Sequence, residues 1–506
     1  MASQHHDIDI AETHEKSGHV SSSAAIDGNV VNKGNNLHLP VSEKLQPTWR
    51  SYIWDSLDKS SEERRFLFKF DALVLTLACL GSFIKFLDQV NVSSAFVSGM
   101  KEDLNLQGNQ LNYLITSWTV GYVIGQIPSN MVITRVRPSI WIPTCEVIWS
   151  VLTIIMAKCT NVNQMYAIRF LVGLAESAFY PGMQYLLGSW YRKDELGKRS
   201  CILQASSFIG AMFSGYLMAA TYNLGGVNGY KGWQWLFIID TVISLPIAIA
   251  GFFILPDTPE ITRAWWLSYN DKAIAKRRME LENRGNREPY SRAKLRKIFT
   301  GWHIYVLVFL YVLYNNNGNY GGQPGFQLWL KSEGYGVREV NLYPTIALAI
   351  AVVFALIFGW TSDSLFRGAR WPPVILAGTA NIVINVSLAV WDIPLGWKWA
   401  CYMLGGLPNG LGAVILAWGT EICGSDNEER AFVVAAMNSM GSAIQAWLPL
   451  LIWKQVDAPR YFKGFLTMVF IAVALNSTAL LTRFLQRREE RRRERDSDRS
   501  ESESNG

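Results

Sequence analysis

Cysteine is scarce in this chain of 506 residues, and the few cysteines are scattered. The six are Cys79, Cys145, Cys159, Cys201, Cys401 and Cys423. Each falls in or at the end of an apolar run, where a thiol is ordinarily buried and inert. No two of them form a C-x-x-C pair, so the pattern excludes a disulfide framework. It gives no metal-ligand spacing either, and we expect no metal site.

Signatures of enzymes are missing as well. The sequence has no Walker loop, no G-x-S-x-G elbow and no H-E-x-x-H pair, which leaves nothing to support an enzyme. We therefore expect neither catalytic residues nor a cofactor. A signal peptide is also missing, because the first sixty-odd residues are polar and contain no apolar core. Residues 1–65 are expected to form a disordered tail.

Long apolar runs, by contrast, are abundant. Half of the residues are hydrophobic, and a membrane-spanning helix needs about 20 apolar residues. Twelve runs qualify, near residues 70–97, 111–134, 139–158, 164–187, 199–221, 233–255, 303–323, 342–362, 372–391, 397–423, 430–456 and 462–485. The sequence therefore predicts an all-α membrane protein with twelve transmembrane helices.

The Lys and Arg residues of the loops indicate the orientation in the membrane. With twelve spans both tails lie on one side, where the loops carry about twenty Lys and Arg residues, against about nine on the other side. Both tails are therefore expected in the cytoplasm. A polar loop, residues 256–301, separates a six-helix bundle over 66–255 from a second over 302–485, and such paired repeats are typical of transporters. Residues 486–506 are expected to be a disordered, mixed-charge tail whose arginines can touch anionic lipid.

Charged residues lie inside the first apolar run. Lys85 precedes Asp88 by three residues and Gln89 by four, so the three share one helical face. An ionisable group at mid-membrane costs about 2.5–3.5 kcal/mol on insertion scales, so it normally faces a polar cavity or a partner. Two interpretations remain open here. Either the charges form an internal salt bridge that only holds helices together, or they line one helix face that binds substrate and transfers protons in a transporter.

The fourth run contains Arg169 and Glu176, seven residues apart, and a spacing of nearly two turns points both the same way. The depths of Asp88 and Arg169 along their helices agree closely enough for the two to pair. Glu176 lies about two turns nearer the midplane. Burial favours the neutral form of a carboxyl group, so Glu176 can pick up and release a proton, or it can be a neutral group hydrogen-bonded for packing.

The seventh run is interrupted by amides. Asn315, Asn316, Asn317 and Asn319 occupy four of five positions, and Tyr320 follows. So many amides in so short a stretch exceed what hydrogen-bonded bridging between helices requires. The cluster can unwind the helix and line a cavity, since irregular backbone is tolerated in a membrane where it borders one.

A loop after the eighth run, GWTSDSLFRGARW, has a composition that suggests a role in conformational change. Gly359 permits a close approach, Asp363 can meet a helix N-terminus, and Arg367 can pair with acids. This loop resembles the loop signature of the major facilitator superfamily in its second-half copy. The first-half copy, VITRVRPSIW, is degenerate and lacks the Asp.

Further stretches narrow the resemblance. FLDQVNVSSAFVSGMKEDLNL, RFLVGLAESAFYPG, LGSWYRKDELGKR and WQWLFIIDTVISLPIAIAGFFILPDTP together resemble the fungal allantoate-permease branch of the anion:cation symporters. Within that branch they look most like the fungal pantothenate transporters, with the biotin transporters close behind. The likeness runs from about residue 66 to 483 and omits both tails.

The resemblance implies two six-helix bundles, alternating access and proton symport of small organic anions. The family's first-helix motif, Asp-Arg-x-Asn, falls on Asp88, Gln89 and Asn91. It implies that Asp88 pairs with Arg169, that Glu176 carries the proton, and that an arginine at position 89 meets the substrate carboxylate. Gln89 is neutral, so we expect Lys85, one turn earlier, to supply the charge, although without the planar fork of arginine.

The resulting expectation is a monomeric, multi-pass plasma-membrane symporter that imports a small organic anion. Pantothenate is the first candidate substrate. Its partners would be substrate, protons and membrane lipid, and not nucleic acid. The residues expected to bind substrate are Lys85, Gln89, Asn316, Asn319 and Tyr320; those for proton coupling and gating are Asp88, Arg169 and Glu176; those of the conformational loop are Gly359, Asp363 and Arg367. Alternatives are import of biotin, allantoate or another carboxylate, export of an organic acid, and a non-transporting nutrient receptor.

Overall fold

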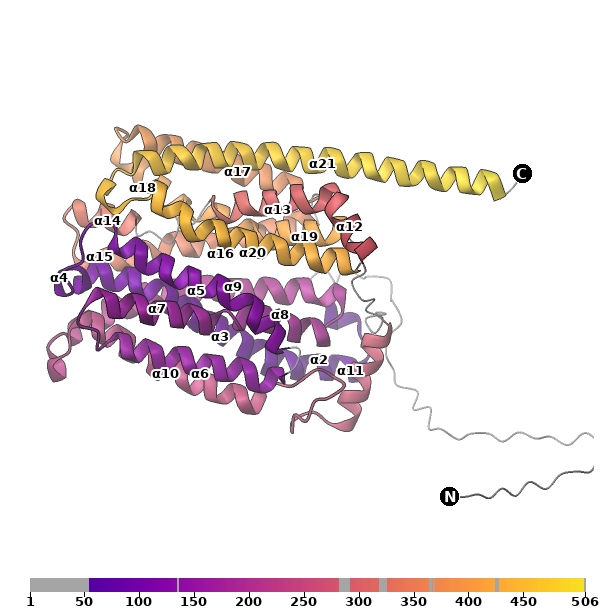
Figure 1. The fold of residues 1–506 in the computed structure, drawn as a ribbon, viewed down its shortest axis with the longest axis horizontal. Coiled ribbons are helices and arrows are strands. Elements are labelled where there is room, and N and C mark those ends of the chain that lie inside the picture. Colours follow the sequence, from indigo (N-terminus) through magenta and orange to yellow (C-terminus); the bar gives the residue numbers. More distant parts are fainter. Residues whose placement is uncertain are drawn as a thin grey trace, which may run out of the picture. The chain divides into compact units, whose positions relative to one another are not determined.

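The computed structural model describes residues 54–133, 136–281, 292–317, 325–363, 366, 369–423 and 427–504 (Figure 1). Within these ranges the regular structure is helical and contains no β-strand, which confirms the predicted all-α class. Asn319, Tyr320 and Arg367 lie outside the described residues, as does most of the predicted N-terminal tail.

The first half of the chain forms a bundle whose labels follow Figure 1. Its helices are α2 (Ser61–Phe70), α3 (Thr76–Ala95), α4 (Lys101–Asp103), α5 (Gln110–Ile133), α6 (Pro138–Met156), α7 (Val162–Glu176), α8 (Phe179–Trp190), α9 (Lys193–Thr221) and α10 (Gly232–Ile254). The π-helical turns η2 (Asp71–Leu75) and η3 (Phe96–Met100) join α2, α3 and α4 into one run of 43 residues. At Gly99 in η3 the backbone turns left-handed, with φ of 117°, and bends this run.

Two helices connect the halves, and a second bundle follows. The connecting helices are α11 (Tyr269–Leu281) and α12 (Arg292–Thr300). The second bundle comprises α13 (Trp302–Asn315), α14 (Gly325–Ser332), α15 (Val337–Leu342), α16 (Thr345–Asp363), α17 (Trp371–Val390), α18 (Leu395–Leu404), α19 (Gly412–Ile422), α20 (Asn427–Ile452) and α21 (Phe462–Ser504). Short 3₁₀ turns complete the described structure: η1 (Asp55–Asp58), η4 (Tyr222–Leu224), η5 (Val227–Gly229), η7 (Leu407–Leu411) and η8 (Gln455–Asp457).

Each of the twelve predicted spans coincides with a helix or a pair of helices. Among the described residues, eight helical segments are long and apolar enough to cross a membrane, and nine if α12 and α13, which meet at 59°, count as one span. The remaining predicted spans are α5, α7 with α8, and α20. Polar and charged side chains inside them, such as Gln126, Arg169 and Gln445, lower their apolar character.

Helix pairing repeats between the two halves. In the first half α3 packs on α9, α5 on α7, and α6 on α10. In the second half the corresponding pairs are α13 with α20, α16 with η7 and its flanking helices, and α17 with α21. The first and fifth, second and fourth, and third and sixth spans therefore pair in both, as expected for two copies of one repeat.

The halves meet along α9 with α15 and α16, and along α5 with α20 (Figure 1). Hydrogen bonds between them gather at the end of the bundle that carries η3, α14 and α15. Asn341 Nδ2 donates to Ser98 Oγ at 2.9 Å, and Asn112 Nδ2 donates to the Trp453 carbonyl oxygen at 2.8 Å. Lys331 Nζ forms an ion pair with Glu102 at 3.1 Å. An apolar core with members from both halves, including Trp329 and Trp453, fills the same end.

Both predicted tail boundaries need correction. The helical bundle begins at Ser61 rather than at residue 66, because Ser60 caps α2 by accepting a hydrogen bond from the Glu63 amide. The prediction of a disordered C-terminal tail is wrong for residues 486–504, which continue α21 (Figure 1). Gln486 Nε2 donates to Glu490 Oε1 one turn further on, and such pairs four residues apart stabilise a helix.

Large apolar side chains are exposed along the spans. Val242 of α10, Leu376 of α17 and Phe470 of α21 are 63%, 63% and 67% exposed. Exposed large apolar side chains in such number are unfavourable in water and are expected of helices that face lipid.

Candidate binding and proton-coupling site

Small residues bring the helices of the site together. A Cβ at Gly210 of α9 would overlap the backbone of Phe83 in α3, and a Cβ at Gly173 of α7 would overlap the carbonyl of Trp118 in α5. Glycine lets these backbones touch. The close approaches join α9 to α3 and α7 to α5, the four helices from which most side chains of the site come.

Asp88 and Arg169 form a buried ion pair. Arg169 Nη1 lies 3.5 Å from Asp88 Oδ2, and both side chains are about 98% buried or more. Thr153 Oγ1 of α6 donates a hydrogen bond of 3.1 Å to Asp88 Oδ1. The pair thus ties α3 to α6 and α7, at the depth that the sequence allowed.

Lys85 points to a different partner. Its Nζ donates to the Tyr122 hydroxyl of α5 at 3.1 Å and lies 4.3 Å from the centre of that ring. Tyr122 in turn stacks on Trp118, with ring centres 5.1 Å apart. Within the described part of the chain, no carboxylate lies within ion-pair distance of Lys85, which is only 4% exposed. Gln89, one turn further along α3, is half-buried.

Glu176 is fully buried beside this pair. Asp88, Lys85 and Arg169 all act electrostatically on its carboxyl group. Neither of its oxygens has a hydrogen-bond partner among the described residues, and the same holds for Asp88 Oδ2 and for Arg169 Nε and Nη1. Buried charged atoms are rarely left without hydrogen bonds. Their concentration here marks a place that can exchange protons or accept a polar ligand.

Asp240 is a member of this cluster that the sequence did not reveal. Ser214 Oγ donates to Asn91 Oδ1 at 2.7 Å, and Asn91 Nδ2 donates to Asp240 Oδ2 at 2.8 Å. Asp240 also interacts electrostatically with Asp88 and Arg169. The sequence signal was an acid inside the sixth apolar run, but nothing in it indicated that α10 packs on α3 at Asn91.

The charges of the cluster do not balance without a proton. Lys85 and Arg169 supply two positive charges, and Asp88, Glu176 and Asp240 supply three carboxyl groups, all buried. Two ionised carboxylates would neutralise the cations. A third ionised carboxylate would leave an uncompensated charge, which is costly in a low-dielectric interior. The cluster thus has one more carboxyl group than its cations can neutralise, and an incoming anion would change its charge balance.

Tyrosines extend the site toward the second half. Tyr311 of α13 interacts electrostatically with Tyr122 of α5 and Tyr180 of α8, which belong to the first half. Tyr311 and Tyr314 have ring centres 5.6 Å apart, and the Tyr314 hydroxyl donates to the Asn409 carbonyl at 3.1 Å. Hydroxyl groups from both halves therefore lie near Tyr122, the hydrogen-bond partner of Lys85.

The amide cluster of the seventh span ends its helix. α13 stops at Asn315, and Asn316 Nδ2 caps it by donating to the Val312 carbonyl at 2.9 Å. Asn381 Nδ2 donates to Asn317 Oδ1 at 2.8 Å, and Asn315 Nδ2 donates to Gln445 Oε1 at 3.3 Å. Asn315, Asn316 and Gln445 also line a cavity of about 10 Å³, which has room for about one water molecule.

The loop after the eighth span has a different arrangement from the one expected. A Cβ at Gly359 would meet no atom of the described residues within 4 Å, so among these residues the glycine makes no close approach. Asp363 is the last residue of α16, and Arg367 lies beyond the described ranges. Arg370 provides the ion pair, with Nη2 2.6 Å from Glu421 Oε1 of α19.

The start of α9 anchors a buried ion network. Glu195 forms an ion pair with Arg278 of α11 and accepts Lys59 Nζ at 3.3 Å. Arg278 Nε also lies 3.0 Å from Glu63 Oε1 of α2. Burial raises the pKa of the nearby Tyr191 hydroxyl, and the Asp71 carboxylate, 2.5 Å away, raises it further. The connecting helix α11 is thus fastened to the first half.

Comparison with known proteins agrees with this architecture. The family model described as Major Facilitator Superfamily matches residues 78–449. The chain is 35% identical over 459 residues to the MFS transporter PfmaC of Pestalotiopsis fici, covering 89% of this chain and 86% of that protein. It is 31% identical over 431 residues to a pantothenate transporter of Schizosaccharomyces pombe, covering 85% and 84%. A pantothenate transporter of Saccharomyces cerevisiae is 32% identical over 443 residues, covering 86% of each.

A solved structure shows the same fold at low sequence identity. The xylose transporter XylE of E. coli, in a partially occluded inward-open conformation, matches with a TM-score of 0.59 at 15% identity. The match covers 81% of this chain and 97% of that one.

Proposed function

The chain belongs to the Major Facilitator Superfamily, and we propose that it is a proton-coupled importer of a small organic anion, with pantothenate as the substrate. The observation that carries this proposal is the buried cluster of Lys85, Asp88, Arg169 and Glu176, which places two cations and two carboxyl groups together in the interior of the first half. The choice of substrate rests on the two relatives that are pantothenate transporters.

Each residue of the cluster has a proposed role. Lys85 binds the substrate carboxylate, because it is a cation of the first span with no carboxylate at ion-pair distance within the described residues. Tyr122 orients its ammonium group. Glu176 carries the coupled proton, since its carboxyl group is fully buried next to the Asp88 carboxyl group. Asp88 and Arg169 form the gate, and Asp240 adjusts the charge balance through Asn91.

The second half contributes polar groups to the substrate. Asn316 with Tyr311 and Tyr314 lies on the seventh span, which faces the first half. We include Gln89, Asn319 and Tyr320 among the residues expected to bind substrate, and Gly359, Asp363 and Arg367 as the conformational loop. The contacts at η3, α14 and α15 close one end of the path, which supports alternating access by movement of the two halves.

The location proposed is the plasma membrane, with both termini in the cytoplasm. The excess of Lys and Arg in the loops on the side of the tails supports this orientation. The closed end with η3, α14 and α15 would then face outward, and the protein would be open, or ready to open, toward the cytoplasm.

Uptake measurements test the proposal. The chain is expressed in a yeast strain without its own pantothenate transporter, and uptake of labelled pantothenate is followed at acidic and neutral external pH. We expect uptake that is faster at acidic pH and is abolished by a protonophore. Excess unlabelled biotin or allantoate should not inhibit it. Uptake at the level of the empty vector, with the protein present at the cell surface, would contradict the proposal.

A further inference from the structure

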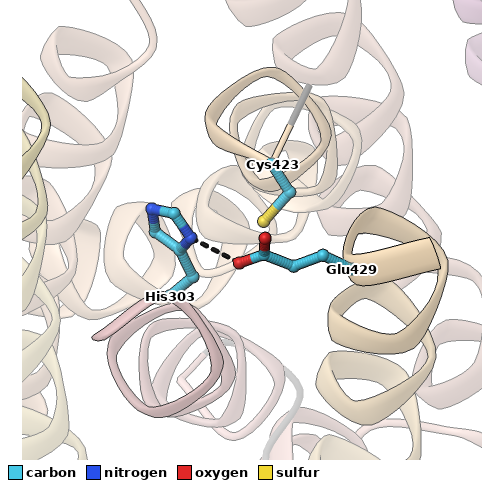
Figure 2. Close-up of side chains that lie close together, drawn as sticks. All are labelled: His303, Cys423 and Glu429. Atoms are coloured by element: carbon cyan, nitrogen blue, oxygen red, sulfur yellow. Dashed lines mark hydrogen bonds and ion pairs between the residues drawn. The ribbon is translucent and has the colours of Figure 1, made fainter. Parts of the chain in front are cut away.

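A second cluster of polar side chains lies at the opposite end of the second half from α14 and α15. His303 is the second residue of α13, Cys423 follows α19, and Glu429 is the third residue of α20. Figure 2 shows the Cys423 thiol and the Glu429 carboxylate directed at one another beside the His303 ring. All three residues are buried, with 9%, 1% and 7% of their surface exposed.

The ligand atoms lie close enough to share one ion. The imidazole nitrogen, the sulfur and a carboxylate oxygen are all within 4.8 Å of one another. Zn²⁺ is bound at about 2.0–2.3 Å by these three ligand types in tetrahedral geometry, which separates neighbouring ligand atoms by about 3.3–3.6 Å. His303 Nδ1 and Glu429 Oε1 now lie 2.6 Å apart in a hydrogen bond. Replacing this proton by a metal requires them to separate by about 0.7 Å, which side-chain rotation provides.

The outer partner of the histidine is also in place. His303 Nε2 lies 3.0 Å from Glu489 Oε2 of α21, and Trp302 Nε1 donates to the same oxygen at 3.1 Å. Histidines that bind a metal through one nitrogen typically donate the other N–H to a carboxylate, which fixes the ring and strengthens the ligand. Glu489 can therefore hold His303 with Nδ1 facing Cys423 and Glu429.

The set of donors indicates the class of metal. A thiolate, an imidazole and a carboxylate suit Zn²⁺ and similar borderline-soft divalent ions rather than Mg²⁺ or Ca²⁺, which prefer oxygen alone. Three protein ligands would leave one position for water, as in many zinc sites. With the tails in the cytoplasm, the cluster would lie on the reducing side of the membrane, where thiols persist.

We propose that His303 Nδ1, Cys423 and Glu429 form a binding site for Zn²⁺ or a similar divalent transition-metal ion, with Glu489 as the residue that orients His303. The ligands come from α13, from the turn after α19, and from α20, so a bound ion fastens the ends of three spans together. Through Glu489 it also fastens α21 to them. The site is separate from the proposed substrate site and does not depend on the identity of the substrate.

Cobalt binding to the purified full-length protein tests the proposal. The protein, reduced and freed of metal in detergent, is titrated with Co²⁺, whose bond to a thiolate gives a charge-transfer absorption in the near ultraviolet. We expect one Co²⁺ per chain with this absorption, and its loss on addition of Zn²⁺. Cys423→Ser should abolish the absorption, whereas Cys401→Ser, at another buried cysteine of the second half, should retain it.

Two further measurements complete the test. Glu489→Gln should keep the absorption and weaken cobalt affinity about 10- to 100-fold, as is usual when the carboxylate partner of a metal-bound histidine is lost. An unchanged affinity would refute the role of Glu489. X-ray absorption of the wild-type protein with zinc needs no variant and should show one sulfur at about 2.3 Å. Absence of metal binding, or binding without sulfur, would overturn the metal site.

Discussion

Lys85 and Asp88 occupy one face of α3, yet their side chains have different partners. Asp88 is held by Arg169 and Thr153, whereas Lys85 contacts the hydroxyl and ring of Tyr122. The two interpretations that the sequence left open therefore apply to different residues: the internal salt bridge is Asp88 with Arg169, and the cation suited to binding an anion is Lys85.

Lys85→Ala should raise the half-saturating substrate concentration about 10- to 100-fold, because a hydrogen bond to a charged group contributes about 1.5–3 kcal/mol. Lys85→Arg should restore part of the affinity. Tyr122→Phe, which keeps the ring and removes only the hydroxyl, serves as the control with a smaller effect. Uptake is measured per molecule at the cell surface. Normal affinity in Lys85→Ala would show that this lysine does not bind substrate.

Glu176→Gln should abolish accumulation of substrate against its gradient and leave exchange across the membrane measurable. The amide keeps the size of the side chain but cannot release a proton, so transport continues without coupling. Accumulation and exchange are compared in proteoliposomes with an imposed pH gradient. Glu146→Gln is the matched control, since Glu146 is a buried carboxyl group of α6 outside the charge cluster. Full pH-driven accumulation by Glu176→Gln would assign the coupled proton to another group, and Asp240 would be the next candidate.

At the scale of elements, the connecting helix α11 is fastened to the first half by charge. Arg278 is fully buried between Glu63 of α2 and Glu195 of α9. α21 is fastened to the second half in a similar way, through Glu489 with His303 and Trp302. Segments that composition describes as solvated loop and tail are therefore integral parts of the two bundles at this end.

Arg278→Met should lower the free energy of unfolding of the first half by about 3–5 kcal/mol, because it leaves two buried carboxylates without their shared partner. The matched control is Arg277→Met, since the adjacent Arg277 is exposed and, within the described residues, pairs with the exposed Glu280 on its own helix. A surface change of that kind usually alters stability by less than about 0.5 kcal/mol. Thermal unfolding in detergent compares the two, and equal midpoints would mean that the network does not hold α11.

At the scale of the whole molecule, two bundles with the same helix pairing meet through polar and apolar contacts at one end. The second half repeats the first in its packing but not in its charges. The Asp88–Arg169–Glu176 cluster belongs to the first half, and the second half contributes the Tyr311 and Tyr314 rings, Asn316, and the His303 cluster. This asymmetry suits a mechanism in which one half binds protons and the other half moves against it.

Joining the closed end should stop transport if the halves move apart there. Ser98→Cys with Asn341→Cys replaces a hydrogen-bonded pair across the interface, and a short bifunctional thiol reagent links the two cysteines. We expect uptake to fall at least tenfold after linking and to recover when a cleavable linker is reduced. Each single cysteine variant, treated alike, is the control. Undiminished uptake by fully linked protein would contradict opening at this end.

The sequence by itself determined the membrane class, the number of spans and the charged residues of the first and fourth spans. Apolar runs of sufficient length are a local property, and an ion inside such a run is visible without knowing its neighbours. The family motifs added the expected pairing of Asp88 with Arg169. The interruption of α13 at Asn315 also followed from local composition.

Only the tertiary structure decided which buried groups meet. Asp240 joins the charge cluster because α10 packs on α3, and the Lys85 side chain reaches from α3 to the Tyr122 hydroxyl of α5 rather than to Asp88 on its own helix. His303, Cys423 and Glu429 are more than a hundred residues apart at the extremes, so no local spacing could indicate a shared metal site. α21 continues past the membrane span, where Gln486 contacts Trp418 and Glu489 contacts His303 and Trp302, and such contacts come from segments that the chain brings together only on folding.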